Sequence, residues 1–164
     1  MAAATKGSAK VTLPKDTEIL ITREFDAPRQ LVYKAWTTPE LVERWWAGRR
    51  GRMTSVEIDL REGGSWRYVM EATGGFEVAF HGEFRELVPN QRIVTTEVYE
   101  GAPEGTEPAL NLVTFNESES GGTLLELLVQ CSDRETRDAI IASGMEAGMQ
   151  EHFDLLDELA VTLA

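Results

Sequence analysis

The sequence predicts an α+β fold in which a curved antiparallel sheet of about six or seven strands wraps around a long C-terminal helix. Three observations support this prediction. Short segments of alternating apolar and polar residues, separated by glycine turns, fill most of residues 56–131. A proline-free amphipathic segment follows them. Two short segments that begin near a proline lie between the first strand and the others.

The first strand and two short helices open the predicted fold. Residues 17–25 alternate apolar and polar side chains, as a half-buried strand does. Pro28 suits the first turn of a helix, and apolar residues follow it at helical spacing. Thr38 and Pro39 then predict the start of a second short helix, which ends near Trp46. These helices separate the first strand from the rest of the sheet.

The middle of the chain predicts a meandering run of strands. Gly63-Gly64 and Gly74-Gly75 mark two of the turns, and Gly121-Gly122 marks the turn of the final hairpin. Gly82 lies inside the longest segment and predicts a bulge or sharp bend there. The predicted strands span residues 56–60, 66–70, 76–88, 93–99, 109–117 and 123–131.

The C-terminal segment predicts one continuous helix over residues 133–163. Ser132 and Glu135 have the spacing of a capping box at its start. Apolar residues then recur on one helical face, which needs a large apolar surface to lie against. Gly144 and Gly148 are four residues apart and are therefore neighbours on the helix surface. We expect them to leave a shallow gap that backbone or a ligand fills.

Composition indicates an acidic globular protein. The 164 residues suit a single domain, with residues 1–15 as a flexible N-terminal arm and 16–164 as the folded part. The net charge of −12 disfavours binding to nucleic acid or to an anionic membrane. No apolar run approaches the length of a membrane span. Cys131 is the only cysteine, so no internal disulfide forms, and we expect a cytoplasmic protein.

The residues indicate no metal site, cofactor or catalytic constellation. His81, Cys131 and His152 are far apart in the sequence and lack the short spacing of metal ligands. Cys131 has no histidine near it in sequence that would act as a base. These absences favour a protein without catalysis, and an enzymatic role stays open.

An apolar cavity between the sheet and the long helix is the main functional prediction. Alternation on the strands and periodicity on the helix bring bulky residues toward the same space. Glu86 shares strand parity with Phe80 and joins this set unless a bulge reverses the parity. For any one of the aromatic residues, a place in an ordinary core is the simpler interpretation. The predicted cavity residues are Trp45, Trp66, Tyr68, Met70, Phe80, Glu86, Met145, Met149 and His152.

A basic loop after the second short helix is a candidate anion site. Arg49 and Arg50 lie in this loop, in a chain that is otherwise strongly acidic. Arginines at a cavity mouth would hold a carboxylate or phosphate through charge-assisted hydrogen bonds. The alternative is an exposed loop whose arginines pair with nearby acids.

Five motifs carry a resemblance to a known family. They are F-D-A-P at 25–28, T-P-E-L-V-E-R-W-W at 38–46, D-L-R-E-G-G-S-W at 59–66, F-H-G-E-F-R-E-L-V-P at 80–89 and S-G-M-E-A-G-M at 143–149. In this order and at this spacing the chain resembles the helix-grip (START-like, polyketide-cyclase) superfamily. Within it, the chain is similar to domains like the C-terminal domain of the activator of the heat-shock-protein-ninety ATPase.

The resemblance implies a helix-grip fold with a hydrophobic cavity, and it implies no catalytic residues. We therefore expect a binding module for an apolar or amphipathic small molecule. Two alternatives stay open. One is a domain that interacts with a chaperone, and the other is an enzyme of the cyclase or aromatase type. The residues do not specify the ligand or the oligomeric state.

Overall fold

The computed structural model describes residues 9–47 and 51–163. Over these residues the chain forms eight strands and four helices. In chain order they are β1 (Lys10–Thr12), β2 (Glu18–Phe25), α1 (Arg29–Thr37), α2 (Pro39–Trp45), β3 (Gly51–Ile58), β4 (Ser65–Ala72), β5 (Glu77–Val88), β6 (Arg92–Tyr99), β7 (Ala109–Glu117), β8 (Thr123–Gln130), α3 (Arg134–Ala142) and α4 (Met145–Val161).

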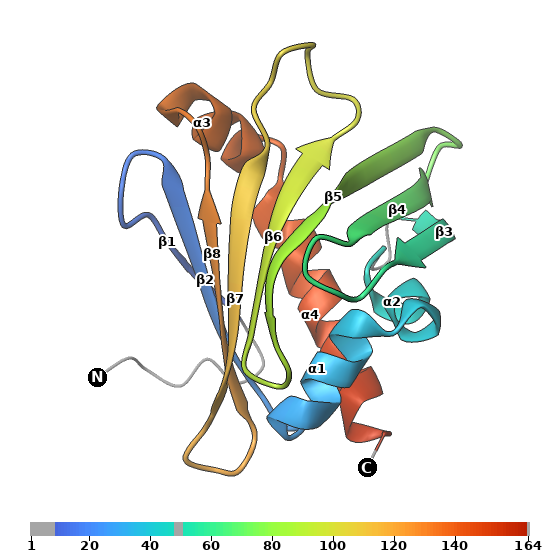
Figure 1. Cartoon of the computed structure of the whole chain (residues 1–164), viewed down its shortest axis with the longest axis vertical. Coiled ribbons are helices and arrows are strands. Elements are labelled where there is room, and N and C mark those ends of the chain that lie inside the picture. Colours follow the sequence, from blue (N-terminus) through green and yellow to red (C-terminus); the bar gives the residue numbers. More distant parts are fainter. Residues whose placement is uncertain (1–8, 48–50, 164) are drawn as a thin grey trace.

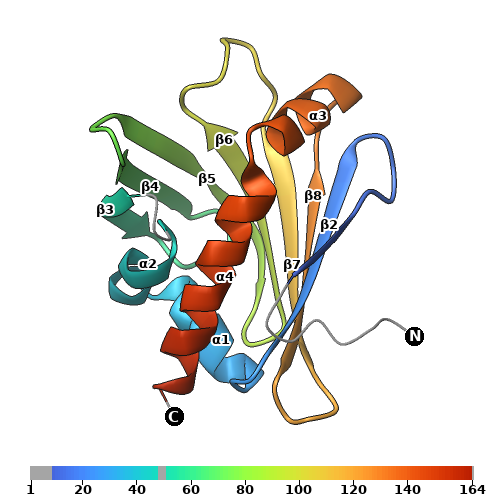
Figure 2. The ribbon, with the colours of Figure 1, turned by 180° about the vertical axis from the view of Figure 1, so that it is seen from behind.

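The strands form one sheet in the order β1-β2-β8-β7-β6-β5-β4-β3, and every neighbouring pair is antiparallel. The sheet curves, and α4 lies along its concave side, with α1 and α2 beside it (Figures 1 and 2). We call the side that faces α4 the inner face. This arrangement confirms the predicted α+β helix-grip fold.

The sheet has one strand more than the sequence predicted, and the extra strand lies in the expected flexible arm. Lys10–Thr12 forms β1, which pairs with the outer edge of β2. Val11 lies opposite Ile21 and packs against the hydrophobic core. A three-residue strand is too short for an alternation pattern to reveal, so the sequence did not separate it from the arm.

The predicted continuous C-terminal helix is wrong, because the chain breaks it at Gly144. This glycine has φ = 84° and precedes the first residue of α4, while α3 ends at Ala142. A left-handed backbone is costly for residues with a side chain and readily adopted by glycine, so the helix ends there. The cap also differs from the prediction. Asp133, and not Ser132, accepts a hydrogen bond from the Thr136 amide and starts α3.

The hydrophobic core lies between α4 and the inner face of the sheet, from β2, β8 and β7 to Ile93 of β6, Phe84 of β5 and Trp66 of β4. Helix α4 contributes Phe153, whose ring packs against Phe25 of β2 with ring centres 5.7 Å apart. Trp36 of α1 contacts both Phe153 and Phe115, so α1 closes the same core from the side. Leu156, Leu159 and Ala160 of α4 are also buried there.

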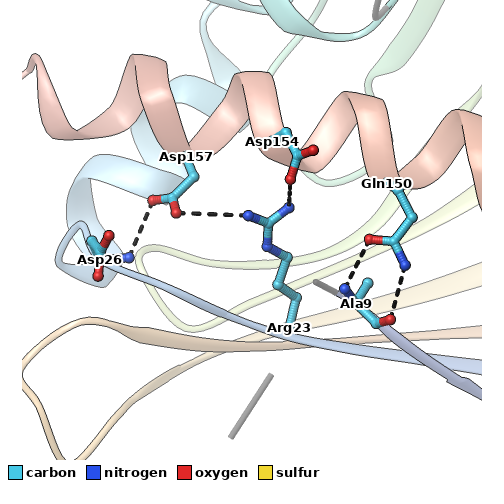
Figure 3. Close-up of polar contacts among 6 residues, drawn as sticks. All are labelled: Ala9, Arg23, Asp26, Gln150, Asp154 and Asp157. Carbon is cyan, nitrogen blue, oxygen red and sulfur yellow. Dashed lines mark hydrogen bonds and ion pairs between the residues drawn. The ribbon is translucent and has the colours of Figure 1, made fainter. Parts of the chain in front are cut away.

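A row of polar contacts fixes α4 to β2 and to Ala9, the residue before β1 (Figure 3). We call Gln150, Arg23, Asp154 and Asp157 the polar seam. The Gln150 amide both accepts from the Ala9 N–H and donates to its carbonyl, each at 2.9 Å. Arg23 is only 2% exposed and lies 2.7 Å from Asp154 and 3.7 Å from Asp157. The seam therefore sets the distance between α4 and this edge of the sheet.

Candidate functional site

Burial varies along the inner face of the sheet. Ile19 and Ile21 of β2 are at most 1% exposed, whereas Leu127 and Val129 of β8 are half-buried. On β4, β5 and β6 the core residues Trp66, Phe84 and Ile93 are buried. The inward side chains beside them on these strands, Tyr68, Phe80 and Glu97, are only half-buried. Packed protein interiors normally leave few such partly covered rings. The surface around Tyr68 and Phe80 is therefore the region where a ligand has aromatic surface to cover.

An aromatic cluster covers this part of the inner face. We define it as Trp46, Tyr68, Phe80 and His152. Trp46 directly follows α2, and the others come from β4, β5 and α4. Trp46 stands at its centre, with ring centres 5.3 Å from Tyr68, 5.2 Å from Phe80 and 5.6 Å from His152. The cluster therefore joins the second short helix, the sheet and the C-terminal helix.

Trp66 extends the aromatic surface across β5 to β6. Its ring centre lies 4.8 Å from that of Tyr68, and its indole N–H donates to the Thr96 carbonyl at 3.2 Å. The indole reaches that carbonyl over Gly82, where a Cβ atom would collide with both the carbonyl and the indole nitrogen. Close packing thus explains Gly82, and the predicted bulge lies further along, between Phe84 and Glu86.

Glu97 is the acidic group of the inner face. It lies four residues after the buried Ile93 on β6, so both side chains point inward. Its Oε1 accepts a hydrogen bond from the Asn111 amide at 3.0 Å. Burial raises the pKa of the Glu97 carboxyl, although the Asn111 hydrogen bond opposes this. Burial, together with the negative charge of Glu97, also raises the pKa of Tyr68.

The structure places Glu86 away from the inner face, and its prediction as a cavity residue is wrong. The β5 bulge changes the alternation after Phe84, so that Leu87 packs against the core and its neighbour Glu86 points the other way. Glu86 forms an ion pair with Arg92 at 2.7 Å. The alternation in β6, which places Glu97 in line with Ile93, was the signal that would have identified the acidic residue.

Trp45 also lies elsewhere than predicted. It is buried, and its indole N–H donates to the Ala35 carbonyl at 2.9 Å. It packs against Trp36 and so belongs to the core around α1. Its neighbour Trp46 occupies the position that we expected for it.

The other predicted cavity residues are distributed as follows. Trp66, Tyr68, Phe80 and His152 come together in or beside the aromatic cluster. Met149 is buried on α4, Met145 is half-buried at the start of that helix, and Met70 is half-buried on β4. Arg49 and Arg50 lie outside the described residues.

The outer face carries a separate cluster of charges around Glu100. Arg67 donates to both Glu100 oxygens at 2.9 Å, and His81 Nδ1 lies 2.9 Å from Oε2. These contacts lower the pKa of Glu100 to about 2. Two depressions of about 440 and 480 Å³ border His81. None of the predicted cavity residues lines them.

The described part of the chain shows neither metal-site geometry nor a membrane-spanning helix. Within residues 9–47 and 51–163, no three His, Cys, Asp or Glu side chains gather in a group that would hold a metal ion. Among the same residues, no helix combines the length and the apolar character needed to cross a membrane.

Comparison with known proteins identifies the family. The family described as "Activator of Hsp90 ATPase homolog 1-like protein" matches residues 26–160. The chain belongs to this family. The matched residues include the whole aromatic cluster, together with Trp66 and Glu97. A comparison with the curated proteins finds no match.

Solved structures share the fold of this family member over nearly its whole length. A protein from Rhodobacter sphaeroides is 26% identical, with 94% of this chain and 99% of that chain covered and a TM-score of 0.87. A protein from Nitrosomonas europaea is 21% identical, with 92% and 97% covered and a TM-score of 0.81. A protein from Mycobacterium smegmatis is 23% identical, with 92% and 96% covered and a TM-score of 0.80.

The raised pKa of Glu97 leads to a prediction about stability and pH. The folded state holds the Glu97 proton more tightly than the unfolded state, whose ordinary pKa is 4.5. This stabilisation is complete below pH 4.5 and is lost as the pH rises through the folded-state pKa. Glu97→Gln removes the titrating group. We expect the variant to match the wild type near pH 4 and to be more stable at pH 8, as measured by urea unfolding.

Glu86→Gln is the matched control for this measurement. It makes the same change of charge on β5 but removes an exposed ion pair with Arg92, so the stability gain at high pH should not appear. Tyr68 and Cys131 both interact electrostatically with Glu97, and burial raises the pKa of each. A stability difference between Glu97→Gln and wild type that stays constant from pH 4 to 8 would contradict the prediction.

Proposed function

We propose that this family member binds a small, largely apolar molecule on the inner face of the sheet, over the aromatic cluster. The observation that carries the proposal is the partial exposure of an aromatic cluster on the inner face. Core residues such as Phe25 and Leu156 are fully buried, whereas Trp46, Tyr68 and Phe80 stay partly exposed inside a concave fold. A bound molecule would complete the packing that the side chains leave open.

Polar groups at the edge of this surface would orient the ligand. Glu97, Asn111 and the Tyr68 hydroxyl lie on the inner face among apolar side chains. Ligand sites typically combine an apolar lining with a small number of such groups. The proposed site has this composition.

A pair of phenylalanine variants tests the proposal. Neutral 2-naphthol should change the tryptophan emission and raise the melting temperature, because a ligand that binds only the folded state stabilises it. Phe80→Ala should weaken its binding about tenfold, since it removes a ring from the site. Phe76→Ala is the control, because Phe76 is 60% exposed at the start of β5. Its affinity should equal that of the wild type.

Native mass spectrometry of gently purified protein gives an independent test. A reproducible adduct mass would support the site and indicate the size of its natural occupant. Absence of any adduct, together with a flat fluorescence response or equal losses in Phe80→Ala and Phe76→Ala, would defeat the proposal.

A second candidate function is interaction with a chaperone, which the family description favours. It requires no ligand on the inner face. Stimulation of the ATPase of a purified heat-shock-protein-ninety chaperone by this protein, without any small-molecule adduct, would favour it over ligand binding.

A further inference from the structure

We propose that the inner face binds an organic cation, an amine or quaternary ammonium on an apolar body, with the Glu97 carboxylate as its counter-ion among aromatic rings. This inference rests on the proposed function, because it names the chemical class of ligand for the same site.

The register of β5 and β6 places Glu97 beside the Trp66 indole. His81 pairs with Val98 and Phe84 pairs with Thr95, so Gly82 lies opposite Glu97. Because Gly82 has no side chain, the indole of Trp66 lies over it and reaches the Thr96 carbonyl. Trp66 and Glu97 therefore belong to the same row of the inner face, with only Gly82 between them.

Aromatic rings form the next row of the sheet. Tyr68 pairs with Phe80, and Phe80 pairs with Tyr99, across three adjacent strands. The rings of Phe80 and Tyr99 have centres 5.2 Å apart, and Trp46, the residue after α2, packs on this row. Ring faces attract organic cations, with Trp the strongest, and the attraction increases where water is excluded. A carboxylate beside several rings is the combination that recognises an ammonium group.

The charges on the buried residues favour a cationic ligand over an anionic one. The two buried arginines in the described part of the chain, Arg23 and Arg137, are already used. Arg23 pairs with Asp154 and Asp157, and Arg137 bonds Asp138 and two backbone carbonyls. Neither of these buried arginines, which are the buried arginines among the described residues, would compensate an anionic ligand beside Glu97.

A cationic ligand would supply a positive charge beside the Glu97 carboxylate. Among the contacts of Glu97 the Asn111 amide is a neutral donor, and burial disfavours the charged carboxylate. A buried carboxylate is stable when a positive charge accompanies it. The net charge of −12 also attracts cations to the protein at long range. A neutral ligand would leave the charge of the Glu97 carboxylate uncompensated.

The test uses three ligands of similar shape on the full chain. Benzyltrimethylammonium and neopentylbenzene differ only in one central atom, a positively charged nitrogen in the first and a neutral carbon in the second. Phenylacetate carries an anionic group on the same benzyl body. Dissociation constants come from tryptophan emission at low salt. Glu97→Gln should lower the preference for the cation over the neutral isostere at least tenfold. Glu86→Gln, which changes the net charge equally, should leave the preference unchanged.

Phe80→Leu provides a second variant that leaves the carboxylate intact. It keeps apolar volume but removes a ring face, so the cation preference should fall several-fold while neutral binding changes less. The proposal fails if wild type and Glu97→Gln show the same cation preference, or if phenylacetate binds best. Ligand binding as such would survive both results. Binding of none of the three ligands would overturn this inference and the proposed function together.

Discussion

Leu156→Ala is expected to lower the free energy of unfolding by about 2–5 kcal/mol. Leu156 is 0% exposed on α4 and belongs to the core cluster that joins this helix to the sheet. Its truncation removes apolar contacts and leaves a cavity that rigid strands on one side cannot collapse to fill. Urea unfolding followed by tryptophan fluorescence measures the change.

Val161→Ala is the control on the same helix, because Val161 is 45% exposed in its last turn. It should change stability by less than about 0.5 kcal/mol. If Leu156→Ala also changed the free energy of unfolding this little, Leu156 would not contribute to the packing of α4 on the sheet.

The polar seam should give the second large effect. Asp154→Asn with Asp157→Asn should destabilise the protein by about 3 kcal/mol, because the Arg23 guanidinium then stays buried without a counter-charge. Burial of Arg23 is already costly in the wild type, because its Nε has no hydrogen-bond partner within the described residues. Its guanidinium also lies 5.1 Å from the Phe25 ring centre, in the apolar core.

A triple variant separates charge from packing at the seam. Adding Arg23→Met to the two asparagine changes should recover more than half of the lost stability, because the unpaired buried charge is removed. Asp59→Asn is the control, since it breaks the exposed Arg61–Asp59 ion pair and should cost less than about 0.5 kcal/mol. A triple variant less stable than the double variant would show that Arg23 contributes through its packing.

The sequence predicted most of the sheet because each strand carries its own alternation. The segment at residues 109–117 corresponds directly to β7, and residues 17–25 lie within one residue of β2. Gly144 was harder to interpret, because the apolar spacing continues through it and a glycine inside a helix is tolerated at modest cost. The left-handed backbone at Gly144 breaks the helix, and the apolar spacing carries no signal of it.

The candidate site was predictable in composition but not in its individual members. Trp45 and Trp46 are adjacent, and the helical period alone cannot decide which of them faces the sheet. Helix α2 is too short to fix that rotation, so its tertiary contacts decide it. Glu86 was misplaced for a similar reason. The bulge after Phe84 shifts the alternation by one residue, and nothing at Arg85 signals it in the sequence.

The position of β8 between β2 and β7 has a consequence for the growing chain on the ribosome. Glu18 and Gln130, which face each other across β2 and β8, are 112 residues apart. Ribosomes add about 5–20 residues each second, so β2 waits on the order of ten seconds for its central partner. During that time its apolar residues and one unpaired edge are open to other nascent chains. Slow, late closure of the sheet is therefore expected, as for folds dominated by distant contacts.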